Sequence, residues 1–497
     1  FDINRDTTYQ GGLTGAIVPD GTGDSVLYPF YTVYDGATTS FSLANTSETA
    51  TIAAKVRFRD AQYSQDQLDF IVVLSPKDKF DFFVSNGGGV TTATWTDNSC
   101  VIGYAGSVYD DVKSLGFRGT YANTPTGHME VIGMLDLNGL EAGSGVDLDD
   151  AAKHAPLRNP NNPAVTEYYP ENCGALKDAF VDRAAVNAIR EEANGDILSG
   201  VPAALTRHDV TNDTLMGSMV VTLPGTGIEA GTDAIMVRNT FERGFLAAQS
   251  PNLCTGTGDP TTLQGTNLCY AVVPADNQEW DHPNLRDINW VGAEGALGSN
   301  TVAVLDELMT AQAVAGDWSN NSDLDVGTDW VIPFITKYVY MNGEALCNAG
   351  DKLTGYTPWP VCQESPFTSA EIGNVYVRGV DEETTTIPSP GIAIGQPDIS
   401  NEVNVFTFSN ESGDPAPLAS YISGARETLR FSDSLLAIRG WAKMEIDWNP
   451  NGNFVTHQFN RLDGAVVVPL VWTVRATASP DENNGSLRGL SRINDLP

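Results

Sequence analysis

The fold is most constrained by a series of short segments in the first 85 residues, each rich in β-branched and aromatic residues and each followed by a turn. Within residues 53–59, the apolar side chains Ala54, Val56 and Phe58 alternate with charged ones. Further segments of this kind span residues 26–34, 38–44, 68–74 and 80–84. Alternation places one face of each strand in a core, and turns at intervals of about ten residues are typical of an antiparallel sandwich rather than of βαβ units.

Strand patterns return in the second half of the chain. They occupy residues 216–223, 234–239, 329–341, 403–408, 438–446 and 465–476. Because proline cannot donate to a β-ladder, Pro333 indicates an edge strand or a bulge, whereas the last segment reads as a central strand interrupted at Pro469. The sequence therefore predicts a mainly β protein with two antiparallel β-sandwich-like domains.

Helical patterns interrupt the strands at two places. Residues 171–194 place apolar side chains on one broad helical face before the stop signal of Gly195. A shorter pattern over residues 302–315 ends at Gly316. We predict an N-terminal β-sandwich over residues 1–144, a helix-containing insertion over 145–215, and a β-rich domain over 216–497 with a short helix near 302–315.

The charge balance restricts location and partners. The chain of 497 residues carries 63 acidic against 28 basic side chains, a formal net charge of −35. A negative field repels nucleic acid and anionic lipid, and no apolar stretch is long enough to span a bilayer. We expect no nucleic-acid partner, no membrane insertion, and an extracellular or cell-surface location reached after removal of a signal peptide.

The cysteine pattern also favours an oxidising compartment. The six cysteines are Cys100, Cys173, Cys254, Cys269, Cys347 and Cys362. None forms a CxxC motif, and two pairs flank loops of similar length at 254–269 and 347–362. The simplest pairing joins each local pair and leaves Cys100 to Cys173, although six cysteines allow about 15 pairings.

One strand pattern concentrates cations in a chain that has few. Lys55, Arg57 and Arg59 share the face opposite to the apolar side chains of residues 53–59. These cations could protect an exposed sheet from pairing. Alternatively, they form a basic stripe that contacts an acidic loop on a neighbouring copy, and we take them as candidate subunit-contact residues.

Acidic loops raise the possibility of bound calcium. Residues 447–453 place oxygen-bearing side chains at alternate positions before a glycine, as in the first half of a calcium loop, but the twelfth position is Gln458. The same residues suit a hairpin turn. Residues 321–329 and 147–150 are comparable acidic loops. The candidate calcium ligands are Asp447, Asn449, Asn451, Asp323, Asp325 and Asp329, and the turn and calcium interpretations both stay open.

Four segments resemble a family of exported, β-rich bacterial surface proteins without a characterised activity. They are YPFYTVYDGATTSFSLANTS, KVRFRDAQYSQDQLDFIVVLSP, TDWVIPFITKYVY and NEVNVFTFSN. The resemblance spans roughly residues 25–85 and 325–410. It implies export and a two-part β architecture, and it assigns no catalytic residue.

No sequence signature names a reaction. The chain contains no HExxH, GxSxG or P-loop motif. We therefore expect a non-enzymatic, structural exported protein that self-assembles with other copies of itself into a surface layer, sheath or filament. One alternative is an adhesin or carbohydrate-binding module that uses exposed aromatic residues, with Trp318, Trp330, Trp359 and Trp472 as candidates. The other is a secreted hydrolase.

Overall fold

The structure is a computed structural model. It describes residues 7–8, 14–18, 21–61, 66–103, 113–117, 124–141, 145–158, 166–181, 213–238, 240–242, 288–290, 309–320, 325–335, 372–379, 402–409, 426–430, 439–446, 465–466, 469–475, 479, 481 and 483–493. Strands dominate these residues, and the mainly β, sandwich-like fold class is confirmed.

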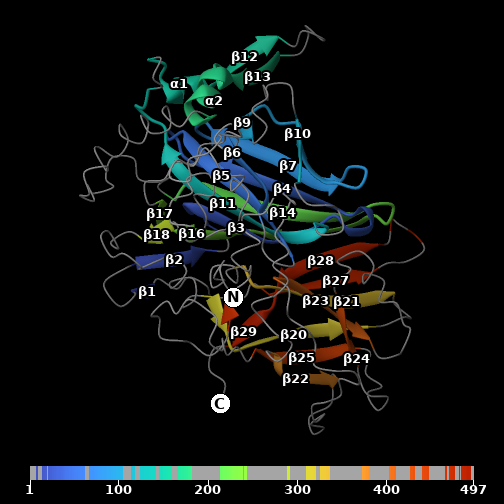
Figure 1. Ribbon diagram of the computed structural model, residues 1–497. Helices are drawn as coiled ribbons and strands as arrows, with labels where there is room; N and C mark the ends of the chain where they lie inside the picture. Colours follow the sequence, from blue (N-terminus) through green and yellow to red (C-terminus); the bar gives the residue numbers. More distant parts are fainter. Residues whose placement is uncertain are drawn as a thin grey trace, which may run out of the picture.

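Two large antiparallel sheets form the first sandwich (Figure 1). The eight-stranded sheet has the order β1 (Thr7–Thr8), β2 (Thr14–Val18), β16 (Ile235–Arg238), β3 (Ser25–Thr32), β11 (Thr126–Asp136), β5 (Ile52–Asp60), β6 (Asp66–Leu74) and β9 (Cys100–Gly103). The six-stranded sheet has the order β10 (Ser114–Gly116), β8 (Thr91–Trp95), β7 (Lys79–Asn86), β4 (Thr38–Asn45), β14 (Leu215–Leu223) and β15 (Ile228–Asp233).

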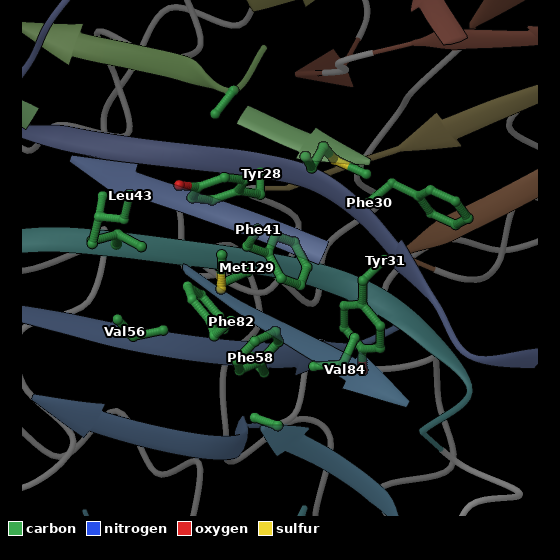
Figure 2. Packing of buried hydrophobic residues seen from close by; sticks show 14 of the residues in the cluster. Tyr28, Phe30, Tyr31, Phe41, Leu43, Val56, Phe58, Phe82, Val84 and Met129 are labelled. Carbon is green, nitrogen blue, oxygen red and sulfur yellow. The ribbon is translucent and has the colours of Figure 1, made fainter. Parts of the chain in front are cut away.

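Aromatic side chains from the inner faces of both sheets fill the first core. Phe58 of β5 contacts Phe41 of β4 and Phe82 of β7, at ring-centroid distances of 5.7 and 6.2 Å (Figure 2). Each buried ring contributes on the order of 1.5–3 kcal/mol relative to exposure, before conformational entropy is subtracted. The period-two pattern of residues 53–59 and 38–44 therefore has the expected cause, because one face of each strand enters this core.

The C-terminal strands form a second sandwich. Its four-stranded sheet has the order β22 (Ile372–Gly379), β25 (Arg439–Ile446), β20 (Ala313–Ser319) and β29 (Ser491–Ile493). Its five-stranded sheet has the order β24 (Arg426–Arg430), β23 (Val403–Ser409), β21 (Val326–Pro333), β27 (Leu470–Arg475) and β28 (Asn484–Gly489). Phe408 of β23 stacks on Trp318 of β20 at 5.9 Å, which joins the two sheets.

The five-stranded sheet also packs against the first sandwich. Trp472 of β27 meets Phe30 of β3 edge to face at 6.5 Å, and Val331 of β21 belongs to the same apolar cluster. At one border, Asn483 Nδ2 donates to the carbonyl oxygen of Thr226 at 2.6 Å. The core of the first sandwich thus extends onto one face of the five-stranded sheet, and the other face of this middle sheet packs on the four-stranded sheet.

Short elements complete the described structure. A 3-10 turn spans Tyr34–Gly36, and three two-stranded sheets pair β12 (His154–Arg158) with β13 (Thr166–Pro170), β17 (Thr240–Glu242) with β18 (Ile288–Trp290), and β19 (Thr310–Ala311) with β26 (Ala465–Val466). Two α-helices are assigned among these residues, α1 (Leu148–Ala152) and α2 (Cys173–Val181). No helix among the described residues has the length and apolar character needed to cross a membrane.

The insertion between β11 and β14 covers one end of the eight-stranded sheet, away from the second sandwich (Figure 1). Leu148 of α1 and Leu176 and Phe180 of α2 belong to a cluster that also contains Ala53 and Ile71 of the sheet. A helix in the predicted segment 171–194 is therefore present from Cys173 to Val181, and its remaining residues lie outside the described ones.

Several predictions about the C-terminal part need correction. Strands β14, β15 and β16 belong to the first sandwich, so a domain boundary at residue 216 divides that sandwich. The helix predicted for 302–315 is wrong from Thr310 onwards, where β19 and β20 pair with distant strands. Pro333 ends β21, which lies inside its sheet rather than at an edge. β27 begins after Pro469, as predicted for an interrupted inner strand, and the β23–β24 pair is parallel.

Candidate functional site

A polar cleft opens where the insertion meets the first sandwich. Its volume is about 620 Å³. It is lined by Ser75, Pro76, Lys77, Asp78, Asp81, Thr96, Asp97, Asn98, His154, Glu167 and Tyr168. These residues come from the turn between β6 and β7, from the start of β7, from the loop between β8 and β9, and from the β12–β13 hairpin.

The first wall of the cleft is a tight turn that a buried side chain, Asn45, holds by hydrogen bonds. Asp78 N donates to Ser75 O at 3.1 Å, Pro76 occupies the second position, and Lys77 has a φ of +63°, a combination typical of a type II turn. Asn45 Nδ2 donates to the carbonyl oxygens of Leu74 and Ser75 at 3.2 and 3.1 Å. The buried Asn45 side chain therefore holds the end of β6 and the start of the turn.

The second wall is the loop that connects β8 to β9. Asp97 Oδ1 accepts hydrogen bonds from Ser99 N at 2.7 Å and from Ser99 Oγ at 2.6 Å. Asp78 of the first wall also approaches this serine, with Asp78 Oδ2 3.2 Å from Ser99 Oγ. Asn98 Nδ2 donates to the carbonyl oxygen of Tyr168 at 3.1 Å, which ties this loop to the hairpin.

A disulfide anchors the third wall. Cys100, at the start of β9, is bonded to Cys173, at the start of α2, with a Cα–Cα distance of 5.5 Å. The hairpin that carries His154 and Tyr168 lies in the chain between α1 and α2. The cross-link therefore holds the insertion beside the β8–β9 loop, and the predicted Cys100–Cys173 pairing is confirmed. The other four cysteines lie outside the described residues.

The histidine in the cleft does not form a Ser-His-Asp relay. Ser75 Oγ lies 3.3 Å from His154 Nδ1, and Asp78 Oδ2 lies 3.7 Å from the same nitrogen. A catalytic triad needs the serine and the carboxylate on opposite ring nitrogens. Burial raises the pKa of the Asp78 carboxyl, and the adjacent His154 opposes this shift. Ser75, His154 and Asp78 therefore form a polar cluster without the geometry of a triad.

Lys55, Arg57 and Arg59 do not form an exposed stripe. They are 1%, 0% and 2% exposed, so the expectation that they lie at the surface, where they could contact a neighbouring copy, is wrong. The alternation itself is correct, but the second face of β5 is buried as well. Lys55 Nζ lies 2.5 Å from Asp69 Oδ1, and Arg59 Nε lies 2.7 Å from Glu130 Oε1.

The predicted calcium ligands are not brought together where they are described. Asp325 lies in a turn, while Asp329 is fully buried within β21. Four residues of extended chain span roughly 13 Å, too far for both carboxylates to bind one ion. Asp323, Asp447, Asn449 and Asn451 lie outside the described residues.

The carboxylates of Asp147, Asp149 and Asp150 do lie close together, but their positions at the start of α1 account for this. Asp147 accepts from the backbone nitrogens of Asp149 and Asp150 as the N-cap of α1. Lys153 lies 2.6 Å from Asp149 and 2.8 Å from Asp150, and these hydrogen bonds raise the pKa of the Lys153 ammonium. Capping and ion pairing account for the cluster without a metal.

The tryptophans proposed as ligand-binding residues are core residues. Trp318, Trp330 and Trp472 are at most 2% exposed, and Trp359 lies outside the described residues. Sequence reasoning missed Tyr168, which is 59% exposed beside the cleft, and Trp441, which is 47% exposed on β25. The available signal for Tyr168 was the polar and aromatic run TEYYP shortly before Cys173.

Comparisons with protein-family models, with curated proteins and with solved structures found no significant match.

Proposed function

We propose that this chain is an exported structural protein that self-assembles into an extracellular layer, sheath or filament. The observation that carries the proposal is the middle sheet, which packs on both sides and makes two sandwiches into one building block. The Cys100–Cys173 bond supports maturation in an oxidising compartment, and the net charge of −35 suits saline surroundings.

Contacts between copies would depend on main-chain pairing rather than on the basic stripe. Lys55, Arg57 and Arg59 are buried, so no charge attraction from them opposes the repulsion between acidic copies. Pairing at a sheet edge does not depend on charge. Among the described strands, β22 and β29 are the edge strands of the four-stranded sheet. The edge strands β15 and β28, which belong to two different sheets, instead contact each other within one chain.

Electron microscopy of the producing cell's surface, with antibody labelling of this chain, tests the proposal. We expect labelled ordered assemblies, and purified protein that polymerises as salt screens its charge. Polymers held by edge pairing should persist in EDTA and dissociate only in denaturant, as followed by light scattering. Dissolution by EDTA alone would instead assign the contacts to bridging calcium. A monodisperse monomer at high concentration, with and without calcium, would contradict self-assembly.

A second candidate function is glycan binding, as in an adhesin. The specific observation that favours it is the cleft, whose lining combines the exposed residue Tyr168 with polar groups held in place by hydrogen bonds. This function is compatible with assembly, because a surface polymer can present such a cleft many times. The assay is binding of labelled glycans to the intact chain.

A further inference from the structure

The cleft beside the disulfide combines two features that saccharide ligands use. Its volume of about 620 Å³ falls within the usual range of small-ligand sites, about 300–1,000 Å³. Tyr168 is one of the lining residues and is 59% exposed, although burial of such a ring is normally favourable. An exposed aromatic face offers a platform for the C–H groups of a sugar ring.

The polar groups around this platform are fixed before any ligand arrives. Asp97 Oδ1 is held by both the nitrogen and the hydroxyl of Ser99. Asp78 Oδ1 accepts from Lys79 N at 2.8 Å, and Asp78 Oδ2 lies 3.2 Å from the Ser99 hydroxyl, whose single proton points to the nearer Asp97. Because these carboxylates are already oriented, a ligand that donates hydroxyl protons to them loses less conformational entropy on binding.

The same carboxylates select the charge of the ligand. Four carboxylates line the cleft, Asp78, Asp81, Asp97 and Glu167, against one lysine, Lys77, whose ammonium already pairs with Glu48. The whole chain is also strongly acidic. Uronic acids and sulfated sugars would meet repulsion, whereas sugar hydroxyl groups meet acceptors. Lys79 already pairs with Asp81 at 2.9 Å, which reduces the net charge that faces a ligand.

We propose that this cleft binds a saccharide unit without acidic groups, with the sugar ring stacked on Tyr168 and its hydroxyl groups donating to Asp97 and Asp78. The proposal deepens the second candidate function by naming its site and ligand class. It is independent of self-assembly, which is scored on the same variants by light scattering.

The test is an array of neutral, amino and acidic oligosaccharides, followed by calorimetric titration of the best-retained glycan. We expect retention of non-acidic glycans, a loss of affinity of at least tenfold in Tyr168→Ala, and near-normal affinity in Tyr168→Phe, which keeps the ring. Trp441→Ala is the matched control, because it removes an exposed aromatic residue on β25 in the second sandwich.

Three outcomes would overturn the proposal. They are retention of no glycan, preference for acidic glycans, and equal effects of Tyr168→Ala and Trp441→Ala. Unchanged circular dichroism and unfolding midpoints of both alanine variants confirm that a loss of affinity is local, since both side chains are exposed.

Discussion

At the residue scale, the buried charges on β5 and its neighbours are the least expected feature. Lys55 pairs with Asp69, and Arg59 pairs with Glu130. His128 lies on the same face of β11 as Glu130. Removing ions from water costs several kcal/mol each, and partner charges offset this cost only while both members are present. Each of these residues therefore stabilises the fold only while its partner is present. Replacing one member of a pair should lower the free energy of unfolding more than replacing both.

The first prediction concerns the Lys55–Asp69 pair. Lys55→Met leaves the Asp69 carboxylate buried without this partner, and we expect the free energy of unfolding to fall by about 3–5 kcal/mol. Lys55→Met with Asp69→Leu should recover much of this loss, because no buried charge from the pair remains. Urea denaturation measures both variants.

The control is Lys79→Met, which breaks the Lys79–Asp81 pair whose side chains are each 56% exposed. Its cost should stay below about 1 kcal/mol, because water screens the pair. Equal losses in Lys55→Met and Lys79→Met would show that burial does not govern the Lys55 pair.

The second prediction concerns pH. Burial, assisted by the positive charge of Arg59, lowers the pKa of His128 from 6.5 to about 3. Glu130 also faces this ring, with Oε1 3.9 Å from His128 Nε2. Between these two pH values the unfolded chain binds a proton that the folded chain does not bind. The contribution of the neutral His128 to the free energy of unfolding is therefore fully present above about pH 6.5 and declines as the pH falls towards 3.

His128→Gln removes this titration. We expect the free energy of unfolding to depend less steeply on pH between 3 and 6.5, by up to about 1.4 kcal/mol per pH unit. Thermal unfolding across that range, compared with wild type, measures the slope. An unchanged slope would show that His128 does not contribute to the acid sensitivity.

At the element scale, the insertion is held to the sandwich by an apolar patch and by one cross-link. Leu148, Leu176 and Phe180 pack against the eight-stranded sheet, but α1 has only five residues and cannot persist alone. The Cys100–Cys173 bond closes a sequence separation of 73 residues. The position of the β12–β13 hairpin, and with it the third wall of the cleft, depends on this bond.

The third prediction follows from that dependence. Replacing both Cys100 and Cys173 by serine should lower the free energy of unfolding by roughly 4 kcal/mol, through the greater entropy of the unfolded loop. Urea denaturation measures this loss. Limited proteolysis should then cut first within residues 145–181, while the strands of the sandwich stay protected.

The matched comparison is Lys153→Ala, which changes the insertion without touching the cross-link and removes only part-exposed ion pairs. It should leave the cleavage pattern nearly unchanged. Cleavage that begins instead inside β5 or β11 of the double serine variant would mean that the bond supports the whole sandwich rather than the insertion.

At the scale of the whole molecule, the middle sheet makes the two sandwiches interdependent. One face of the five-stranded sheet carries Trp330 and Phe408 towards the four-stranded sheet. The other face carries Trp472 and Val331 into the core of the first sandwich. Unfolding of either sandwich would expose apolar surface of the other, so we expect one cooperative transition in the wild-type protein.

The fourth prediction tests this coupling. Trp472→Ala removes the contact with Phe30 and should cost about 3–5 kcal/mol. Differential scanning calorimetry should resolve two transitions in this variant. Trp441→Ala, which removes an exposed tryptophan from β25, should keep one transition near the wild-type temperature. Two transitions in the wild type would show that the sandwiches unfold independently.

The sequence by itself determined where many of the strands lie. The predicted segments at 38–44, 53–59 and 68–74 match β4, β5 and β6 to within two residues at each end, and a tight turn at Ser75–Asp78 follows the last of them. These features depend on alternation and on turn residues, which are local properties. The Cys100–Cys173 pairing also followed from the count and spacing of the cysteines.

Tertiary structure alone decided what covers each face and which distant segments meet. Alternation showed that Lys55, Arg57 and Arg59 share one face of β5, but not that this face is buried. Residues 313–319 became β20 because β25 pairs with them across more than a hundred residues. The cleft unites the 75–78 turn and the 96–98 loop with His154, Glu167 and Tyr168 through a disulfide and loop hydrogen bonds. Burial and convergence depend on contacts between segments far apart in the chain, and local periodicity carries no information about those contacts.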